Sequence, residues 1–331
     1  MLVLSEADLR EILPMRDVIG AVERGFRAVA DGKVVIPQRL QTSIFGGVFL
    51  HMPAYASLEL EGETSSEQKT AGVKIASVFG ENPRRGLEVV QATYLLLDGE
   101  TGVPLSLMDG PFITALRTAA TSALATRLMA SPGPKRLGLF GAGVLAEFHA
   151  HAMVEVAKVG SISISSRTTE KAQALARRLE NEFHIQCAVL SPSELASTSD
   201  LICTCTTSPA PVFPGTALRD DVHINAVGAF TPATREVDTV AVRRATVVID
   251  AHEAAGSEAG DVLIPIAEGA ITRSHIKGTL ADLVSNRIMV RQSQGGVTIF
   301  KSCGLAIEDL VTAHLAYSRA QKRGVGTIVS M

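Results

Sequence analysis

Three basic residues in apolar surroundings are the first candidates for chemistry. Arg39 lies in Ile36-Pro-Gln-Arg39-Leu, Lys74 in Ala71-Gly-Val-Lys74-Ile-Ala, and Arg117 in Thr114-Ala-Leu-Arg117-Thr-Ala-Ala-Thr. A charge buried without a partner is costly, so basic residues in such settings indicate a binding or catalytic use. Together they predict an anion clamp, for which a carboxylate is the natural small guest. Alternatively, Arg39 could be a strand-edge charge and Lys74 could extend its amine to the surface.

A glycine-rich turn predicts a second site, one for a dinucleotide. The segment Leu137-Gly-Leu-Phe-Gly141-Ala-Gly143-Val-Leu-Ala146 runs from an apolar strand through Gly-x-Gly-x-x-Ala into a helical stretch, Glu147–Lys158. The first glycine permits a tight turn, the second lets backbone approach a pyrophosphate, and the helix N-terminus is aimed at the phosphates. A second β-run, Ser161–Ser166, follows in the expected order and favours a nucleotide site over a bare packing turn.

The residues after that second strand favour NADP(H). Sites for NAD usually place an acidic residue here for the ribose 2′-hydroxyl, whereas an arginine suits a 2′-phosphate. This chain has Ser166-Arg167-Thr168 and no carboxylate before Glu170. Because a guanidinium is planar, charged and matched to phosphate oxygens, Arg167 predicts NADPH as cofactor, with NADH as a weaker donor. An exposed arginine that binds nothing is the alternative.

Composition indicates a globular protein of about two domains by the usual length prior. Of 331 residues, 46% are hydrophobic and 20% charged, and the net charge is −3. This charge, with 4% aromatic residues and no Trp, gives no reason to expect nucleic acid or a membrane surface as partner. The N-terminal segment carries acids where a signal peptide would be basic, and no apolar stretch has the length of a membrane span. We therefore expect a cytoplasmic protein.

The cysteines predict neither a disulfide framework nor a metal site. Four cysteines are too few for such a framework in a chain of 331 residues. Cys203 and Cys205 lie in one β-like run, so their side chains should point to opposite sheet faces. We expect them to be small buried hydrophobic residues.

The pattern from residue 137 onward predicts a Rossmann-type α/β domain with a doubly wound parallel sheet. Its clearest helix, Thr169–Phe183, has Ala and Leu on one face and charged residues on the other. Strands that alternate with helices indicate parallel pairing, and we assign residues 116–304 to this dinucleotide-binding domain. The expected strands lie near 137–141, 161–166, 186–190, 200–206, 222–228 and 246–250.

The remaining residues, 1–115 with 305–331, predict an α+β domain for substrate binding and dimerisation. A helix is expected at Ser5–Asp31, before an antiparallel pattern rather than a second Rossmann half. Its strands are expected near 40–50, 71–79 and 89–97.

Two further helices are expected outside the Rossmann pattern. An Ala-rich helix, Ile113–Ala130, leads to a linker at Ser131–Pro134. The closing helix, Ala306–Lys322, is expected to return to the N-terminal domain.

Eight segments in fixed order resemble the ornithine cyclodeaminase/mu-crystallin family. The resemblance runs nearly end to end and is specific for the family, though not for one reaction within it. It implies a homodimer whose N-terminal sheets pack across the two-fold axis, with a nucleotide held between two domains. The segments are Leu50-His-Met-Pro-Ala-Tyr55, Gly72-Val-Lys74, Thr101-Gly-Val-Pro-Leu-Ser-Leu-Met-Asp109-Gly, Arg117-Thr-Ala-Ala-Thr-Ser122, Gly141-Ala-Gly-Val, Ile224-Asn-Ala-Val-Gly228-Ala, Gly260-Asp261-Val and Phe300-Lys-Ser-Cys-Gly-Leu-Ala-Ile-Glu-Asp309.

The resemblance also implies roles for individual residues. Arg39, Lys74 and Arg117 match positions that hold a substrate carboxylate beside C4 of the nicotinamide. Candidate proton donors are Lys74 and a water held by His51 or Thr231. Asp261, Lys301 and Asp309 look typical of the family but receive no chemistry from the sequence. Positions that match cofactor contacts are Thr118, Gly141, Ala142, Gly143, Val144, Leu145, Ser166, Arg167, Thr168, Cys205, Thr206, Thr207, Val227, Gly228 and Ala229.

One departure from the family determines the reaction that we expect. Cyclodeaminases of the family carry an aspartate two residues beyond the glycine that matches Gly228, and this chain has Phe230 there. Phe230 can neither accept a proton nor pair with an ammonium, so deamination of ornithine or lysine loses its carboxylate. An alanine dehydrogenase role is weakened less decisively.

Family members without that acid resemble reductases of cyclic imino acids. The expected reaction is therefore hydride transfer to the imine carbon of Δ1-pyrroline-2-carboxylate to give L-proline, and also of Δ1-piperideine-2-carboxylate to give L-pipecolate. Phe230 and Thr231 are expected beside the substrate ring. The alternatives are an amino-acid dehydrogenase, an ornithine or lysine cyclodeaminase, and a non-catalytic NADP(H)-binding protein of the crystallin type.

Overall fold

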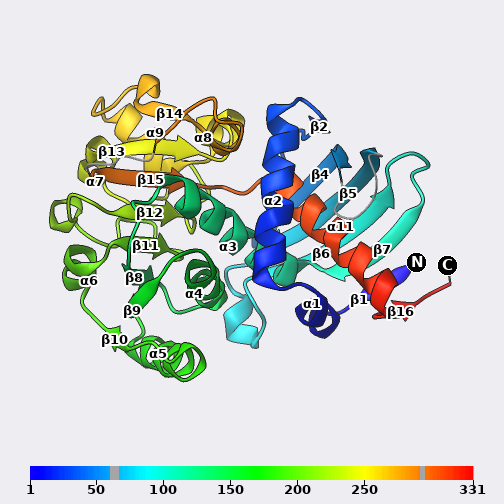
Figure 1. Ribbon diagram of the computed structural model, residues 1–331, viewed down its shortest axis with the longest axis horizontal. Coiled ribbons are helices and arrows are strands. Elements are labelled where there is room, and N and C mark those ends of the chain that lie inside the picture. Colours follow the sequence, from blue (N-terminus) through cyan, green and yellow to red (C-terminus); the bar gives the residue numbers. More distant parts are fainter. Residues whose placement is uncertain (60–66, 291–294, 331) are drawn as a thin grey trace. The chain divides into compact units, whose positions relative to one another are not determined.

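The computed structural model describes residues 1–59, 67–290 and 295–330. The chain forms two compact units, Met1–Arg117 with Leu305–Met331, and Thr118–Gly304. The division falls inside helix α3, Gly110–Met129, rather than at Ser131–Pro134, which connects α3 to the first strand of the second unit. Figure 1 labels the elements of both units.

The unit Thr118–Gly304 contains an eight-stranded sheet in which every neighbouring pair of strands is parallel. Its order, β10-β9-β8-β11-β12-β15-β13-β14, confirms the expected Rossmann-type α/β fold. The strands are β8 Lys135–Phe140, β9 Val159–Ser165, β10 Cys187–Val189, β11 Leu201–Thr204, β12 His223–Ala226, β13 Ala245–Ile249, β14 Ile276–Thr279 and β15 Val297–Lys301.

Helices cover both faces of this parallel sheet, with α4 on one side and α6 and α7 on the other (Figure 1). The core beneath α6 and α7 includes Phe140 and Phe213, whose ring centroids are 5.0 Å apart. Helix α5 has the predicted bounds, because its apolar and charged faces are clearly separated in the sequence. The helices are α4 Val144–Val156, α5 Thr169–Phe183, α6 Pro192–Thr198, α7 Thr239–Arg244, α8 His252–Ser257, α9 Gly260–Ala267 and α10 Leu280–Val284.

Strands β14 and β15 are not among the expected strands, and β15 is central to the sheet. It lies between β12 and β13, with Ile299 opposite both Ile224 and Val247. All five residues of β15 are buried, so the strand lacks the polar alternation of a half-exposed strand. Its insertion places Lys301 at the carboxyl end of the sheet, opposite Ala226.

The unit Met1–Arg117 with Leu305–Met331 contains a sheet of order β16-β1-β7-β6-β5-β4-β2, with β3 also paired to β4. The antiparallel expectation is wrong in one place, because β1 lies parallel to β7. The expected strand near 40–50 is two strands, separated by a turn in which Gly46 has φ +79°. The strands are β1 Leu2–Leu4, β2 Val34–Val35, β3 Leu40–Ile44, β4 Gly47–Glu59, β5 Glu67–Val78, β6 Val90–Asp98, β7 Pro104–Asp109 and β16 Thr327–Ile328.

The expected helix Ser5–Asp31 is divided into α1, Glu6–Ile12, and α2, Met15–Ala30. Pro14 causes the break, because a proline lacks the N–H of the helical ladder and disfavours helical backbone in the preceding residue. Leu13 accordingly has φ −116° and ψ 78°. The closing helix α11, Ala306–Arg323, begins as predicted and ends one residue later.

Helices α2 and α11 pack together against one face of this sheet (Figure 1). Gly25 lets the two helices approach closely, since a Cβ there would lie 3.1 Å from Val311 Cγ1. Alternate residues of β4 and β5, including Met52 and Lys74, are buried on the covered face. The opposite face carries Pro53, which is exposed, and Ile75, which is 45% exposed.

Candidate active site

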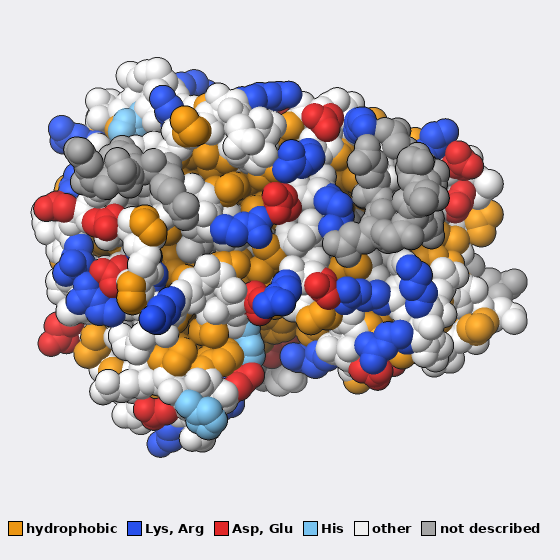
Figure 2. All heavy atoms as spheres, viewed as in Figure 1, with side chains coloured by type: hydrophobic (Ala, Val, Ile, Leu, Met, Phe, Trp, Pro, Cys, Tyr) orange, Lys and Arg blue, Asp and Glu red, His pale blue; other side chains and the backbone are white. Residues whose placement is uncertain are grey.

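A buried cluster of opposite charges joins β5, α3 and α11. Lys74 Nζ donates to Asp309 Oδ1 at 3.0 Å and lies 2.8 Å from Oδ2. Arg117 donates from Nε to Asp309 Oδ1 at 3.0 Å and from Nη1 to Glu308 Oε2 at 2.6 Å. Charged side chains on the molecular face in Figure 2 intermingle at the surface, whereas Lys74 and Arg117 are only 3% and 4% exposed.

Arg117, which lies in an apolar segment of the sequence, has acidic partners in the structure. Its neighbours within α3 are apolar, but Glu308 and Asp309 reach it from the first turn of α11. A helix N-terminus favours negative charge, so both carboxylates lie where the α11 dipole stabilises them. Leu305 N also donates to Glu308 Oε1 at 2.9 Å, which fixes that side chain against the start of the helix.

The pKa values in the cluster reflect burial and charge together. Burial and the nearby Arg117 lower the pKa of Lys74 to about 8, although Asp309 opposes the shift. Burial alone would raise the pKa of Asp309, but Arg117 and Lys74 outweigh it and hold that pKa below its ordinary value. Lys74 can therefore change protonation near neutral pH while Asp309 stays ionised.

The Tyr94 hydroxyl adjoins the cluster. Tyr94 lies directly opposite Lys74 on β6, is fully buried, and has a hydroxyl without a hydrogen-bond partner among the residues described. Gly72 makes room for it, because a Cβ there would lie 2.4 Å from the Tyr94 oxygen. Burial, and then the charge of Asp309, raise the pKa of Tyr94 well above its ordinary value. The phenol therefore stays protonated and can donate a hydrogen bond.

Arg39 and His51 differ in their relation to the cluster. Arg39 immediately precedes β3, is half-buried, and adds to the charges that lower the Lys74 pKa. His51 neighbours Met52 on β4, and Met52 is the residue opposite Lys74. Since successive strand residues point to opposite faces, His51 lies on the face away from Lys74. The proposal of a water held by His51 beside Lys74 is therefore wrong.

The glycine-rich turn in the second unit fits a dinucleotide pyrophosphate. Gly141 directly follows β8 and has φ +107°, and a Cβ there would lie 2.6 Å from Cys205 O. Gly143 is exposed, is the N-cap of α4 without a side-chain cap, and would direct a Cβ into open space. The first turn of α4 thus offers backbone N–H groups to an approaching anion. Helix α4 begins at Val144, three residues before the predicted start.

The other predicted cofactor positions follow strands β9, β11 and β12. Ser166, Arg167 and Thr168 come directly after β9, and Arg167 is exposed. Segments 205–207 and 227–229 follow β11 and β12, at the same edge of the parallel sheet, and Thr118 lies in α3. Phe230 is 38% exposed, and Thr231 Oγ1 lies 2.8 Å from Thr234 Oγ1.

Several buried groups at these two sites have no role that the sequence alone could assign. Glu308 and Asp309 resemble ordinary first-turn acids, and their partners are 191 and 192 positions away along the chain. Glu236, which is fully buried in the second unit, had no distinguishing neighbour in the sequence. Cys203 is buried as expected, and burial raises the pKa of its thiol to about 12. The described residues contain no cluster of His, Cys, Asp or Glu that could hold a metal ion.

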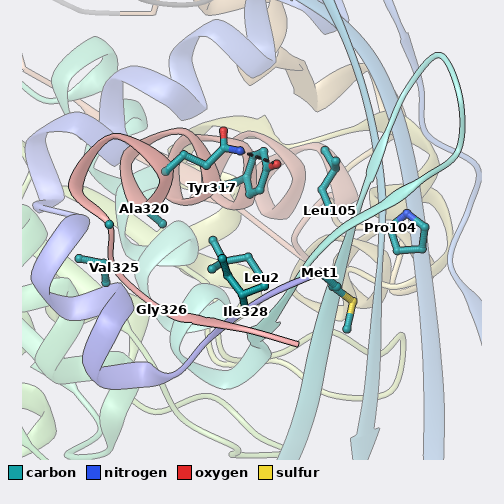
Figure 3. Close-up of a pocket in the computed structure, with 11 residues that line it drawn as sticks. Met1, Leu2, Pro104, Leu105, Tyr317, Ala320, Val325, Gly326 and Ile328 are labelled. Carbon is teal, nitrogen blue, oxygen red and sulfur yellow. Dashed lines mark hydrogen bonds between the residues drawn. The ribbon is translucent and has the colours of Figure 1, made fainter. Parts of the chain in front are cut away.

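A separate pocket of about 490 Å³ lies where β1 and β7 meet the end of α11 (Figure 3). Two of its polar side chains are hydrogen-bonded to each other, since Gln321 Nε2 donates to the Tyr317 hydroxyl at 2.7 Å. Most of the remaining lining is apolar, including Leu2 and Ile328. None of the predicted site residues lines this pocket, and no described helix is long and apolar enough to cross a membrane.

Comparison with known proteins identifies the family of this chain. Residues 1–324 match the model of the ornithine cyclodeaminase/mu-crystallin family. A Δ1-pyrroline-2-carboxylate reductase of Bacillus cereus (strain ATCC 10987 / NRS 248) is 34% identical over 330 residues, which cover 98% of each chain.

Solved structures agree over the whole chain. The Δ1-pyrroline-2-carboxylate reductase of Thermococcus litoralis, in complex with NADH and L-proline, has a TM-score of 0.93 and 37% identity, covering 99% of this chain and all (100%) of that one. An archaeal alanine dehydrogenase dimer with bound NAD has a TM-score of 0.91 and 28% identity, covering 100% of this chain and 99% of that one. These similarities are strong evidence for the fold and the family. The similar proteins are named for more than one reaction.

The buried ion pair predicts an unusual titration of Lys74. In the folded protein, the Lys74 amine should titrate near pH 8, and Asp309→Asn should lower that midpoint because Asp309 opposes the shift. Between pH 8 and pH 10.5 the unfolded chain still holds a proton that folded Lys74 has released, so this group makes the free energy of unfolding rise with pH in that window. NMR of 13Cε-labelled lysine measures the midpoint.

The same variant should lower the free energy of unfolding by about 3–5 kcal/mol, because it leaves buried cations with one carboxylate fewer. Glu100→Gln is the matched control, since Glu100 pairs with Lys69 at 3.3 Å on the surface. That control should change stability by less than about 1 kcal/mol. An ordinary lysine midpoint, or one that Asp309→Asn raises, would contradict this account of the cluster.

Proposed function

Because the chain belongs to the ornithine cyclodeaminase/mu-crystallin family, we propose that it reduces a cyclic imino acid with NADPH. At the coarser level it is a nicotinamide-dependent oxidoreductase of this family. The proposed reaction converts Δ1-pyrroline-2-carboxylate to L-proline, and Δ1-piperideine-2-carboxylate to L-pipecolate. Two similar proteins are named as reductases of the first substrate, and one was solved with L-proline.

The observation that carries the proposal is the buried cation pair beside a half-buried arginine. Lys74 and Arg117 are two buried cations held by Glu308 and Asp309, and the charge of Arg39 also acts on Lys74. A substrate carboxylate would interact favourably with these positive charges. Lys74 also has donors to offer, because an ammonium has three protons and Asp309 is its partner within the described chain.

Lys74 is the proposed proton donor. A cyclic imine becomes a good hydride acceptor when its nitrogen is protonated, so the site needs an acid near neutral pH. Burial and Arg117 bring the Lys74 pKa to about 8, which leaves the amine protonated at pH 7 yet able to release its proton. Arg117 stays charged throughout, since Asp309 and Glu308 outweigh burial and raise its pKa. Arg117 is therefore the binding and orienting member.

The cofactor would supply a hydride when bound. Gly141, Gly143 and the first turn of α4 would hold its pyrophosphate. Arg167 would bind a 2′-phosphate, and the segments 205–207 and 227–229 would hold the nicotinamide end. Phe230 presents an apolar side chain in place of the aspartate expected of a cyclodeaminase.

The test of the reaction is a comparison of substrates with the purified chain. With Δ1-pyrroline-2-carboxylate and NADPH, the chain should consume NADPH and form L-proline in equal amounts, measured by absorbance and chromatography. Lys74→Met keeps the side-chain length but removes the acid, so it should reduce kcat by about 100-fold or more. Ammonia formed from ornithine without net reduction, or faster turnover of alanine with NAD, would replace the proposal with cyclodeaminase or alanine dehydrogenase activity.

The NADPH preference depends on Arg167. Arg167→Ala should weaken NADPH affinity by about 10-fold or more, because it removes charge-assisted hydrogen bonds to the 2′-phosphate, and should leave NADH affinity nearly unchanged. Titration calorimetry with both nucleotides measures this. Arg219→Ala, which removes a surface partner of Asp200 in the same unit, is the control. Equal effects on both nucleotides, or tighter binding of NADH by the parent chain, would reassign the cofactor to NADH.

We also propose a homodimer formed through the face of β4 and β5 that lies opposite α2 and α11. Ile75 is 45% exposed on that face, and Pro53 is exposed beside it. Exposed apolar residues on a sheet face suit an interface with a second copy. Ile75→Asp should therefore shift the sedimentation mass from two chains toward one, whereas Val240→Asp, on the 40% exposed Val240 of α7, should not. A parent chain that sediments as a monomer contradicts the dimer.

A further inference from the structure

A buried carboxylate fastens together the loops that follow β11 and β12. Glu236 is fully buried and accepts four hydrogen bonds, three from these loops and one from the last residue of β11. Its Oε1 accepts from Thr206 N and Thr206 Oγ1, each at 2.6 Å. Its Oε2 accepts from Thr204 Oγ1 and Gly228 N, each at 2.7 Å. With one side chain bonded to both loops, their separation is fixed at this point.

Gly228 permits this close approach. A Cβ at Gly228 would lie 2.1 Å from Thr206 O and 2.6 Å from Glu236 Oε1. Real Cβ contacts are never this short, so the second loop can approach the first only with glycine here. The glycine that aligns with the family segment thus has a packing role in this unit.

The salt bridge between Asp261 and Lys301 supports the backbone of Glu236. Asp261 Oδ1 accepts from Glu236 N at 2.7 Å and Val237 N at 2.8 Å, and Asp261 Oδ2 lies 2.9 Å from Lys301 Nζ. Lys301 also donates to Ala229 O. Asp261 and Lys301 are each 1% exposed, so water offers no competing partner. The start of α9 and the end of β15 therefore hold the two ends of segment 229–237.

Glu236, Asp261 and Lys301 together form a brace, and the order of strands places this brace at one half of the predicted cofactor site. In the sheet, β9 and β11 lie on opposite sides of β8, and β12 follows β11. Arg167 comes after β9 and the glycine turn after β8, so they serve the adenosine and pyrophosphate half. The loops fastened by Glu236 lie beyond them, where the nicotinamide half would extend.

We infer that Glu236 is a positioning residue for the nicotinamide end of the cofactor. This inference rests on the proposed function, in which segments 205–207 and 227–229 contact that end. Glu236 sets the spacing of these segments through Thr206 and Gly228, while Asp261 and Lys301 hold Glu236 and Ala229 in register. The chemistry of the site depends on this spacing, since small misplacements of reacting groups slow a reaction greatly.

The test separates the two halves of the cofactor. Glu236→Gln keeps the side-chain volume but turns an amide N–H₂ toward one backbone donor, either Thr206 N or Gly228 N. Adenosine 2′,5′-bisphosphate, which lacks the nicotinamide, should bind the variant within about twofold of the parent chain, because distant sites are independent. In single-turnover reduction of the imine, hydride transfer from NADPH should slow by about 100-fold. The fluorescence of bound NADPH should also move toward that of free NADPH.

Two further variants complete the test, one with a milder change in the hydrogen bonds of Glu236 and one as a control. Thr204→Val removes one of the four bonds to Glu236 and should give an intermediate loss of rate, so it replaces Glu236→Gln if that variant does not fold. Asp220→Asn, at an exposed surface carboxylate 3.0 Å from Arg244 Nη2, should behave as the parent chain. Equal losses of bisphosphate and NADPH affinity would show a merely structural role and overturn the inference.

Unchanged hydride transfer and fluorescence in Glu236→Gln and Thr204→Val would also overturn the inference, while reduction by the parent chain would stand. A parent chain that binds NADPH but reduces no imine would refute the proposed reaction instead. In that case, a fluorescence change in Glu236→Gln with unchanged bisphosphate affinity would still support the brace.

Discussion

The structure depends on the pairing of Lys74 and Arg117 with carboxylates from α11. Their side chains are buried, and they meet Asp309 from positions 235 and 192 residues away along the chain. A buried ion pair gives little net stability compared with apolar packing, because desolvation offsets the attraction. Breaking it is nonetheless costly, since a lone charge would remain buried. The ion pairs of Lys74 and Arg117 therefore fix how α11 docks on the N-terminal sheet. They also keep two cations at positions where apolar residues would pack equally well.

The second unit uses buried charge in a similar way. Glu236, Asp261 and Lys301 lie at the carboxyl end of a parallel sheet, where ligands of such sheets bind. Burial and Asp261 raise the pKa of Glu236, while hydrogen bonds from Thr206 and Thr204 oppose that shift. Four donors on one carboxylate hold loops that carry no regular structure of their own. In each unit, a charge whose partner is distant in sequence fixes the local arrangement of a predicted site.

Local patterns in the sequence predicted the parts of the fold that depend on local physics. Helix α5 was found at its observed bounds because its two faces differ sharply, and α11 began where expected. Strand β15 was missed because both of its faces are buried, which removes the alternation that marks a strand. The prediction of a single helix across Pro14 is wrong because proline interrupts the helical hydrogen-bond ladder.

The candidate site was predictable in its cations but not in its partners. Lys74 and Arg117 stand out as charges in apolar segments, and the structure brings them together. Glu308 and Asp309 do not stand out, because acids in the first turn of a helix are common. The error about His51 has another cause: its position relative to Lys74 depends on strand register, and Met52 rather than His51 is the residue opposite Lys74.

This arrangement changes how an anion clamp should be understood. The sequence suggested unpaired positive charges that would bind a ligand, but unpaired buried charges would be very unstable. The structure instead gives Lys74 and Arg117 internal carboxylates, so both buried cations are paired without a ligand. A substrate carboxylate would then meet preformed cations whose positions are already fixed by Glu308 and Asp309. Such preorganisation lowers the cost of orienting the substrate, because the protein side chains are ordered before binding.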